Sequence, residues 1–188
     1  DHEFARADPW SPDGSMLAFL ERTPDGQQVI YTIGANGWSG LPLVYPPGNY
    51  SSLSWSPDGG HIAYIEFSED TASKIHVTSA DGNDTVILTD ALPKGEVLYS
   101  GKYAWTRNGR AVSFVAYKHI DEGQDQWIAY EAEVNSGRLV AKATSSTPMH
   151  SWWEGTSFIQ GFDLSTLTWL RSDGTFIRRY VPEVAALS

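Results

Sequence analysis

The chain has 188 residues, a formal net charge of −10 at pH 7, 41% apolar residues and no cysteine. This length and apolar content suit one folded domain with its own core, and they exclude a disordered chain. The acidic balance argues against a nucleic-acid-binding surface and against docking on anionic lipid, and no run approaches the ~20 apolar residues of a membrane-spanning helix.

A short motif repeats along the chain. Trp10-Ser11-Pro12-Asp13-Gly14 recurs as Trp55-Ser56-Pro57-Asp58-Gly59, more weakly as Trp105-Thr106-Arg107-Asn108-Gly109, and in degenerate form as Trp152-Trp153-Glu154-Gly155. The closing glycines of the four copies lie 45, 50 and 46 residues apart. A repeat of this length is typical of architectures that stack one supersecondary unit on the next.

Each motif is followed by apolar stretches that predict short strands. The first stretch of each repeat is 17–20, 62–65, 112–115 or 158–161, the second is 29–31, 75–77, 127–130 or 167–170, and the third is 43–45, 86–88, 139–140 or 176–177. Ser-Pro-Asp-Gly predicts a type I turn that ends in a left-handed glycine, because Pro fixes φ and Gly accepts a positive φ. With the Trp segment as the innermost strand, each repeat predicts a four-stranded antiparallel sheet.

We therefore predict an all-β fold, a β-propeller of four-stranded antiparallel blades with one blade per repeat. Residues 1–188 are predicted to form one domain, with blades at about 9–53, 54–103, 104–150 and 151–182. Four repeats fit three assemblies: a small closed ring, half of a ring assembled from two chains, or part of a larger propeller. An open blade flank would expose an apolar face, so we expect association through the flanks, with a second copy of the chain.

The repeat resembles the TolB-like, WD-related β-propeller repeat family. The second copy matches best, through Trp55 to Gly59, Ile62-Ala63-Tyr64 and Ala80-Asp81-Gly82, whereas the third and fourth copies lack Pro-Asp. Many members of that family lie in the bacterial envelope and bind proteins, and related propellers cap the active site of prolyl-oligopeptidase-type peptidases. The resemblance implies a periplasmic or extracellular location, with the cytoplasm as the alternative.

The sequence shows no catalytic motif, so no catalytic residue, cofactor or metal ligand is predicted. Its five His residues include no His-x-His or His-Glu-x-x-His pattern. Asp13 and Asp58 are interpreted as turn residues, and the repeated Trp side chains as packing between blades.

Candidate binding residues are the aromatics outside the repeated Trp position. Trp38 lies in a Gly- and Ser-rich loop, Trp152 and Trp153 replace a Ser-Pro turn, and Tyr50 and Tyr103 are further candidates. Exposed aromatic residues on loops are common anchors of interfaces, although local packing beneath the loops is the more common explanation for such residues.

Two functions follow from these predictions. One is a non-catalytic interaction or ligand-sensing module that binds a protein or a glycan through loop aromatics. The alternative is the propeller domain of a larger enzyme, such as a prolyl-oligopeptidase-type peptidase, whose catalytic domain lies outside this chain.

Overall fold

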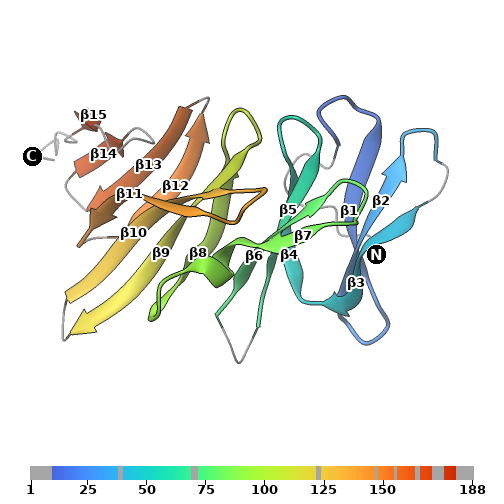
Figure 1. Ribbon diagram of the computed structural model, residues 1–188, viewed down its shortest axis with the longest axis horizontal. Helices are drawn as coiled ribbons and strands as arrows, with labels where there is room; N and C mark the ends of the chain where they lie inside the picture. The colour runs from blue at the N-terminus through green and yellow to red at the C-terminus, as the bar shows by residue number, and fades with distance from the viewer. Residues whose placement is uncertain are drawn as a thin grey trace, which may run out of the picture.

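The computed structural model describes residues 10–37, 40–68, 72–121, 124–146, 148–154, 156–163, 166–170 and 176–180. Within these ranges the chain forms four antiparallel sheets, which lie side by side in chain order (Figure 1). The helical structure there is one 3-10 turn, η1 (Leu88–Ala91). No helix in the described ranges has the length and apolar character needed to cross a membrane.

Each sheet corresponds to one sequence repeat and is named here as a blade. Blade 1 contains β1 (Met16–Arg22), β2 (Gln28–Gly34) and β3 (Leu41–Gly48), and blade 2 contains β4 (Tyr50–Trp55), β5 (His61–Glu66), β6 (Lys74–Ser79) and β7 (Thr85–Ile87). Blade 3 contains β8 (Glu96–Trp105), β9 (Ala111–Asp121), β10 (Gln124–Glu133) and β11 (Leu139–Ser145). Blade 4 contains β12 (Met149–Glu154), β13 (Thr156–Asp163), β14 (Thr166–Leu170) and β15 (Phe176–Tyr180).

The inner strands of blades 2, 3 and 4 begin before the positions that the repeat suggested. In blades 2 and 3 they start at Tyr50 and Glu96, rather than at 54 and 104. The difference arises because the repeated Trp ends the inner strand instead of opening it. In blade 1 the described part of this strand is a single bridge between Trp10 and Leu17.

The turn after each inner strand has one hydrogen-bonding pattern. In blade 2 the Ser56 hydroxyl donates to the Asp58 carboxylate over 2.6 Å, that carboxylate accepts the Gly60 N–H, and Ser56 Oγ accepts the His61 N–H. Blades 1 and 3 repeat the pattern around Asp13 and Asn108. The interpretation of Asp13 and Asp58 as turn residues is confirmed. Hydrogen bonds from Ser11 and Ser15 lower the pKa of Asp13 to about 2.

The closing glycine of the blade 2 turn has the predicted left-handed conformation, with φ of 73° at Gly59. Gly59→Val is expected to lower the free energy of unfolding by about 1–3 kcal/mol, because a β-branched residue is strained there. Gly60→Ala should change it little, since the new Cβ would lie 3.4 Å from the Asp58 carboxylate. Denaturant unfolding of both variants tests this, and equal shifts would contradict the turn assignment.

The two larger buried clusters lie between blades. One buried cluster joins Ala18, Leu20 and Ile30 of blade 1 to Trp55 and other residues of blade 2. A second joins blade 2 to blade 3, and a third lies on blade 3 around Trp127. Blade 4 contacts blade 3 through β12, which lies against β8, β9 and β10.

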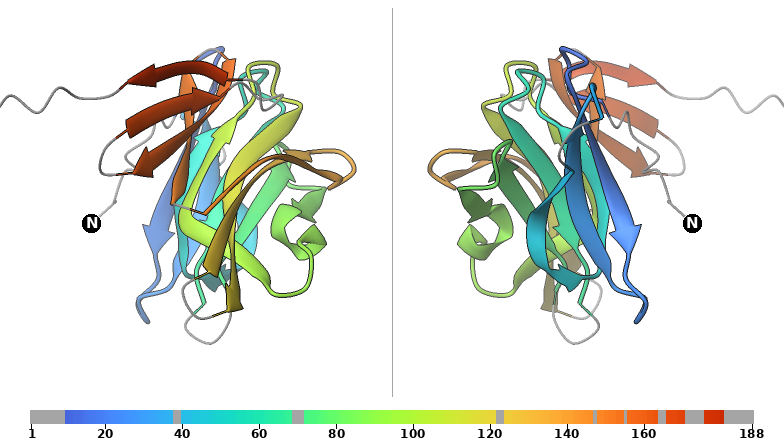
Figure 2. Two further views of the ribbon diagram at one scale, coloured as in Figure 1. Left: turned by 90° about the vertical axis from the view of Figure 1, so that its left-hand side faces the viewer. Right: turned by 90° about the vertical axis from the view of Figure 1, so that its right-hand side faces the viewer.

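The row of blades is open. Blades 1 and 4 lie at opposite ends of it (Figure 1), so the closed four-bladed ring, one of the three assemblies that the sequence allowed, is wrong. Viewed end-on, β1 and β2 stand in front of the other described strands (Figure 2, right).

Candidate functional site

Blades 2 and 3 each pack on the preceding blade through the same four positions, named here the leading face. In blade 2 these positions are the repeated Trp, two residues of the second strand and one of the third: Trp55, Ile62, Tyr64 and His76. In blade 3 the equivalent residues are Trp105, Val112, Phe114 and Tyr130. All eight side chains are buried. The two ring pairs also match, since Tyr64 stacks on His76 with centroids 5.0 Å apart and Phe114 lies 6.1 Å from Tyr130.

Polar contacts reinforce the junction of blades 2 and 3. Trp105 Nε1–H donates to Ser54 Oγ over 3.1 Å. The Tyr103 hydroxyl donates to the backbone carbonyl oxygen of Ala63 over 2.8 Å and also contacts Ser54 Oγ and the Ser52 carbonyl oxygen. Burial raises the pKa of Tyr103, so this hydroxyl stays protonated and remains a donor.

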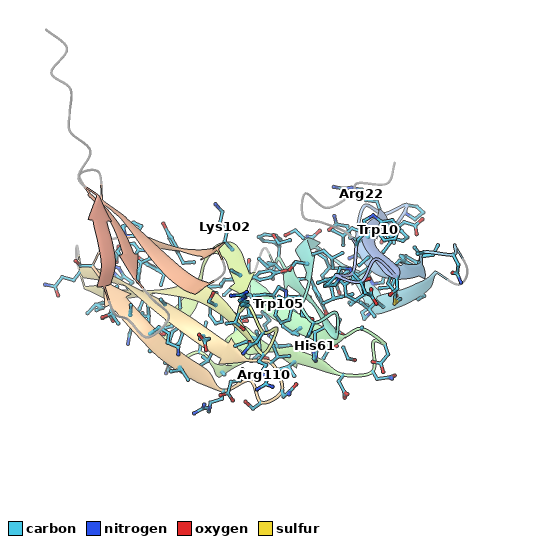
Figure 3. The ribbon with its side chains drawn as sticks, turned by 90° about the horizontal axis from the view of Figure 1, so that it is seen from above. Trp10, Arg22, His61, Lys102, Trp105 and Arg110 are labelled. Carbon is cyan, nitrogen blue, oxygen red and sulfur yellow. The ribbon has the colours of Figure 1, made fainter. Side chains whose placement is uncertain are left out.

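The leading face of blade 1 has the same residue types but is not covered by another described blade. It consists of Trp10, Leu17, Phe19 and Tyr31, and we call it the open flank. Phe19 stacks on Tyr31 with ring centroids 5.7 Å apart, as Tyr64 stacks on His76. Trp10 is 44% exposed, against 8% for Trp55 and 7% for Trp105. Figure 3 shows Trp10 at the end of the row and Trp105 inside it.

A second apolar surface lies at the ends of the strands remote from the repeated turns. Phe67 follows β5, Val97 lies at the start of β8, and Ile120 lies at the end of β9, with exposures of 45%, 40% and 46%. The strands β4 and β8 end at the repeated turns, so the start of β8 and the ends of β5 and β9 lie at the other end of the blades. The three residues share that end, which is named here the hairpin face. Beside Val97 a cavity of about 220 Å³ lies between blades 2 and 3, lined also by the ion pair Lys74–Asp90.

Comparison with known proteins identifies the architecture. No protein-family model and no curated protein matches the chain. Among solved structures, an oligogalacturonate lyase in complex with manganese matches with a TM-score of 0.69, 14% identity, and coverage of 96% of this chain and 52% of that one. The β-propeller domain of the Trilobed protease from Pyrococcus furiosus matches with a TM-score of 0.66, 15% identity and coverage of 93% and 56%. The putative TolB from Agrobacterium tumefaciens matches with a TM-score of 0.59, 17% identity and coverage of 92% and 64%.

The fold is a β-propeller. The similarity to TolB and to other propellers confirms the predicted resemblance at the level of the fold. The chain spans about half the length, 52%, of the oligogalacturonate lyases it matches. The propeller seen here is therefore partial, with four blades in an open row.

Two of the predicted binding aromatics lie in strands of the propeller and not in loops. Tyr50 is buried in β4, edge-on to Tyr64, and its hydroxyl donates to the Pro46 carbonyl oxygen over 3.0 Å. Tyr103 lies in β8 and joins two blades, as described above. The loop placement of both residues is corrected, because the inner strands begin several residues before the repeated Trp.

The predicted placement of the two blade 4 tryptophans in a turn is also corrected. Trp152 and Trp153 lie in strand β12, not in a turn. Trp152 pairs with Phe158 as Trp55 pairs with Ile62 and Trp105 with Val112. Trp152 therefore occupies the repeated position, and a turn one residue shorter than in blades 2 and 3 hid the equivalence. Trp38 lies outside the described residues.

The acidic segment 118–125, which lengthens the third repeat, extends the hairpin of β9 and β10. The His119 ring contacts the Asp125 carboxylate over 2.7 Å, which lowers the pKa of Asp125. In the part of the chain that the structure describes, no group of three His, Cys, Asp or Glu residues is arranged to hold a metal ion.

His76 is a buried titratable group on the leading face of blade 2, stacked on Tyr64. Its Nε2 lies 2.8 Å from the Glu66 carboxylate. Burial lowers the pKa of His76, and the nearby Glu66 carboxylate opposes this shift without cancelling it. At neutral pH the imidazole is therefore neutral and donates Nε2–H to Glu66.

This shift predicts a pH dependence of stability. Because the pKa of His76 is lower in the folded chain than in the unfolded one, only the unfolded chain gains this proton as the pH falls through about 6.5. The free energy of unfolding should therefore fall between pH ~7.5 and ~5.5. His76→Gln, which keeps a donor but does not titrate, should show a smaller fall in denaturant midpoint. An identical fall in both proteins would contradict the role of His76.

Proposed function

We propose that this partial propeller is a non-catalytic interaction module that binds a protein or a glycan, in the periplasm or outside the cell. The observation that carries the proposal is the hairpin face, where Phe67, Val97 and Ile120 are the exposed large apolar residues. Large apolar and aromatic side chains supply most of the binding energy of typical interfaces. The similarity to TolB supports the proposed location.

Several ionisable groups of the described blades are engaged in structure. Asp13, Asp58 and Asp81 accept turn hydrogen bonds, and His76 lies in a blade junction. Apolar contact is then the main source of affinity that the surface offers, and the net charge of −10 favours a neutral or basic partner. Trp38 and Trp153 remain proposed contacts. The hydrogen bonds of Tyr50 and Tyr103 and the repeated Trp position of Trp152 favour structural roles for those three residues.

A binding experiment tests this proposal. The immobilised chain is screened against neutral and basic peptides and against neutral oligosaccharides, and each ligand found is titrated by calorimetry. The double variant Phe67→Ser/Ile120→Ser should weaken binding by about tenfold or more. The control Asn83→Ala, at an exposed turn on the opposite face, should bind normally. A ligand that binds both variants equally well, or a screen without any ligand, would refute the proposal.

The alternative function is that of a propeller domain within a larger enzyme. The similar structures include the propeller of the Trilobed protease, the tricorn protease and a puromycin hydrolase. The sequence of the complete gene discriminates between the two. A further region with Gly-x-Ser-x-Gly followed by Asp and His would favour the enzyme. A signal segment without such a region would favour the envelope module.

A further inference from the structure

The sequence contains two matches to Asn-x-Ser/Thr, the acceptor pattern of N-linked glycosylation. They are Asn49-Tyr50-Ser51 and Asn83-Asp84-Thr85. We propose that Asn83 is an acceptor site for an N-linked glycan and that Asn49 is not. The proposal rests on the location proposed above, in the periplasm or outside the cell, and it is independent of the binding assigned to the hairpin face.

The Asn83 pattern lies in an exposed turn. The turn joins β6 to β7, and β7 is the outermost strand of blade 2. Asn83, Asp84 and Thr85 are all exposed. Gly82, with φ of 76°, is the part of the turn that approaches blade 1, since an added Cβ would lie 3.2 Å from the Leu43 side chain. The turn therefore rests on blade 1 through a residue without a side chain, and the acceptor pattern remains accessible to a large enzyme.

An acidic side chain holds the carboxamide of Asn83. Asn83 Nδ2–H donates to Asp81 Oδ2 over 2.7 Å, and the Asn83 backbone N–H donates to Asp81 Oδ1. The Ser79 hydroxyl donates to the same carboxylate and fixes it in turn. A hydrogen bond to an ionised acceptor is stronger than one between neutral groups. It orients the amide nitrogen and increases its electron density, which resonance in an amide otherwise reduces.

The Asn49 pattern is held inside blade 2. Asn49 itself is exposed, but Tyr50 is buried and Ser51 lies in strand β4. The Asn49 carbonyl oxygen accepts the Phe67 N–H, which ties this segment to the end of β5. The residue two positions before Asn49 is Pro47, which offers no carboxylate to a carboxamide. An enzyme that must enclose three consecutive residues therefore finds this second pattern inaccessible.

The proposed reaction uses an oligosaccharide linked to a lipid diphosphate, which a membrane-bound oligosaccharyltransferase delivers. Asn83 Nδ2 bonds to the anomeric carbon of the first sugar, and the bond from that carbon to the diphosphate oxygen breaks. The nitrogen releases one proton to water, the lipid diphosphate leaves, and no atom is oxidised or reduced. The glycan would extend from the end of blade 2 opposite the hairpin face, so the proposed binding surface stays uncovered.

Mass spectrometry of the exported chain tests the proposal. An added signal segment directs the chain to the periplasm of bacterial cells that contain an oligosaccharyltransferase and its lipid-linked glycan. The intact mass should exceed 20.7 kDa by the mass of one glycan, and peptide mapping should locate it on Asn83. Because the added segment supplies the export, the result depends neither on the native location of the chain nor on binding at the hairpin face.

Three variants test the roles of single residues. Thr85→Val keeps the side-chain shape without the hydroxyl and should abolish the modification, whereas Asn49→Gln should leave it unchanged. Asp81→Asn should keep the turn, because Asn108 accepts the equivalent hydrogen bonds in blade 3, but it should lower the modified fraction. Circular dichroism verifies that each variant is folded.

Four results would overturn the proposal. They are a wild-type chain that keeps its sequence mass, a glycan on Asn49, and a Thr85→Val or an Asp81→Asn chain that is modified as fully as the wild type.

Discussion

Phe114→Ala is expected to lower the free energy of unfolding by about 3–5 kcal/mol. The Phe114 side chain is fully buried between blades 2 and 3, next to Tyr130 and in the same cluster as Trp105. Removing it leaves a cavity that the two sheets cannot fill, because each is fixed by its own backbone hydrogen bonds. Denaturant unfolding followed by tryptophan fluorescence measures the loss.

Phe19→Ala is the matched control for this prediction, because Phe19 occupies the same position in blade 1. Its side chain is half-buried on the open flank, so its removal from the monomer should cost only about 1–2 kcal/mol. The comparison is made at a concentration where the chain is monomeric. Equal losses for the two variants would mean that blade 1 is covered in the monomer, and would contradict the open row.

Gly109→Ala is expected to destabilise the chain by about 2–4 kcal/mol. The residue has φ of 69°, and an added Cβ would lie 2.8 Å from the carboxyl carbon of Asp58 in the neighbouring blade. Asp58 cannot move away without losing its hydrogen bonds to Ser56 and Gly60. The substitution therefore combines backbone strain with a clash between two stacked turns.

Gly14→Ala separates these two effects. Gly14 has nearly the same φ, 70°, but an added Cβ would meet nothing within 4 Å. Its loss should reflect backbone strain alone, about 1–2 kcal/mol. In an Asp58→Ala background the effect of Gly109→Ala should fall to that value, as measured by a double-mutant cycle. If Gly14→Ala and Gly109→Ala have equal effects in the wild-type background, the turns do not contact each other as described.

The fold could be predicted because its information is local and repeated. The Ser-Pro-Asp-Gly turns fix the ends of the inner strands through hydrogen bonds among residues five positions apart or less. The spacing of the turns then gives the number of blades. The start of each inner strand had no comparable signal, because Tyr50 and Glu96 follow segments without a repeated motif.

The candidate surfaces were harder to predict because they depend on neighbouring blades. Trp10 and Trp55 have the same local sequence, yet one is exposed and the other buried, since only Trp55 has a described blade packed against it. Phe67 and Ile120 carry no sequence signal of their own, because they lie at strand ends outside the repeated motif. A comparison of equivalent positions across the repeats would have found the open flank.

The open row itself is tested most directly by distances between spin labels. The chain has no cysteine, so pairs of labels can be introduced at will. One pair, Gln27→Cys with Ala72→Cys, joins the hairpin ends of blades 1 and 2, and the other, Gln27→Cys with Thr166→Cys, joins those of blades 1 and 4. Dilution with unlabelled chain suppresses distances between copies. The open row predicts a clearly longer distance for the second pair, whereas equal distances would show a closed four-bladed ring and contradict the structure.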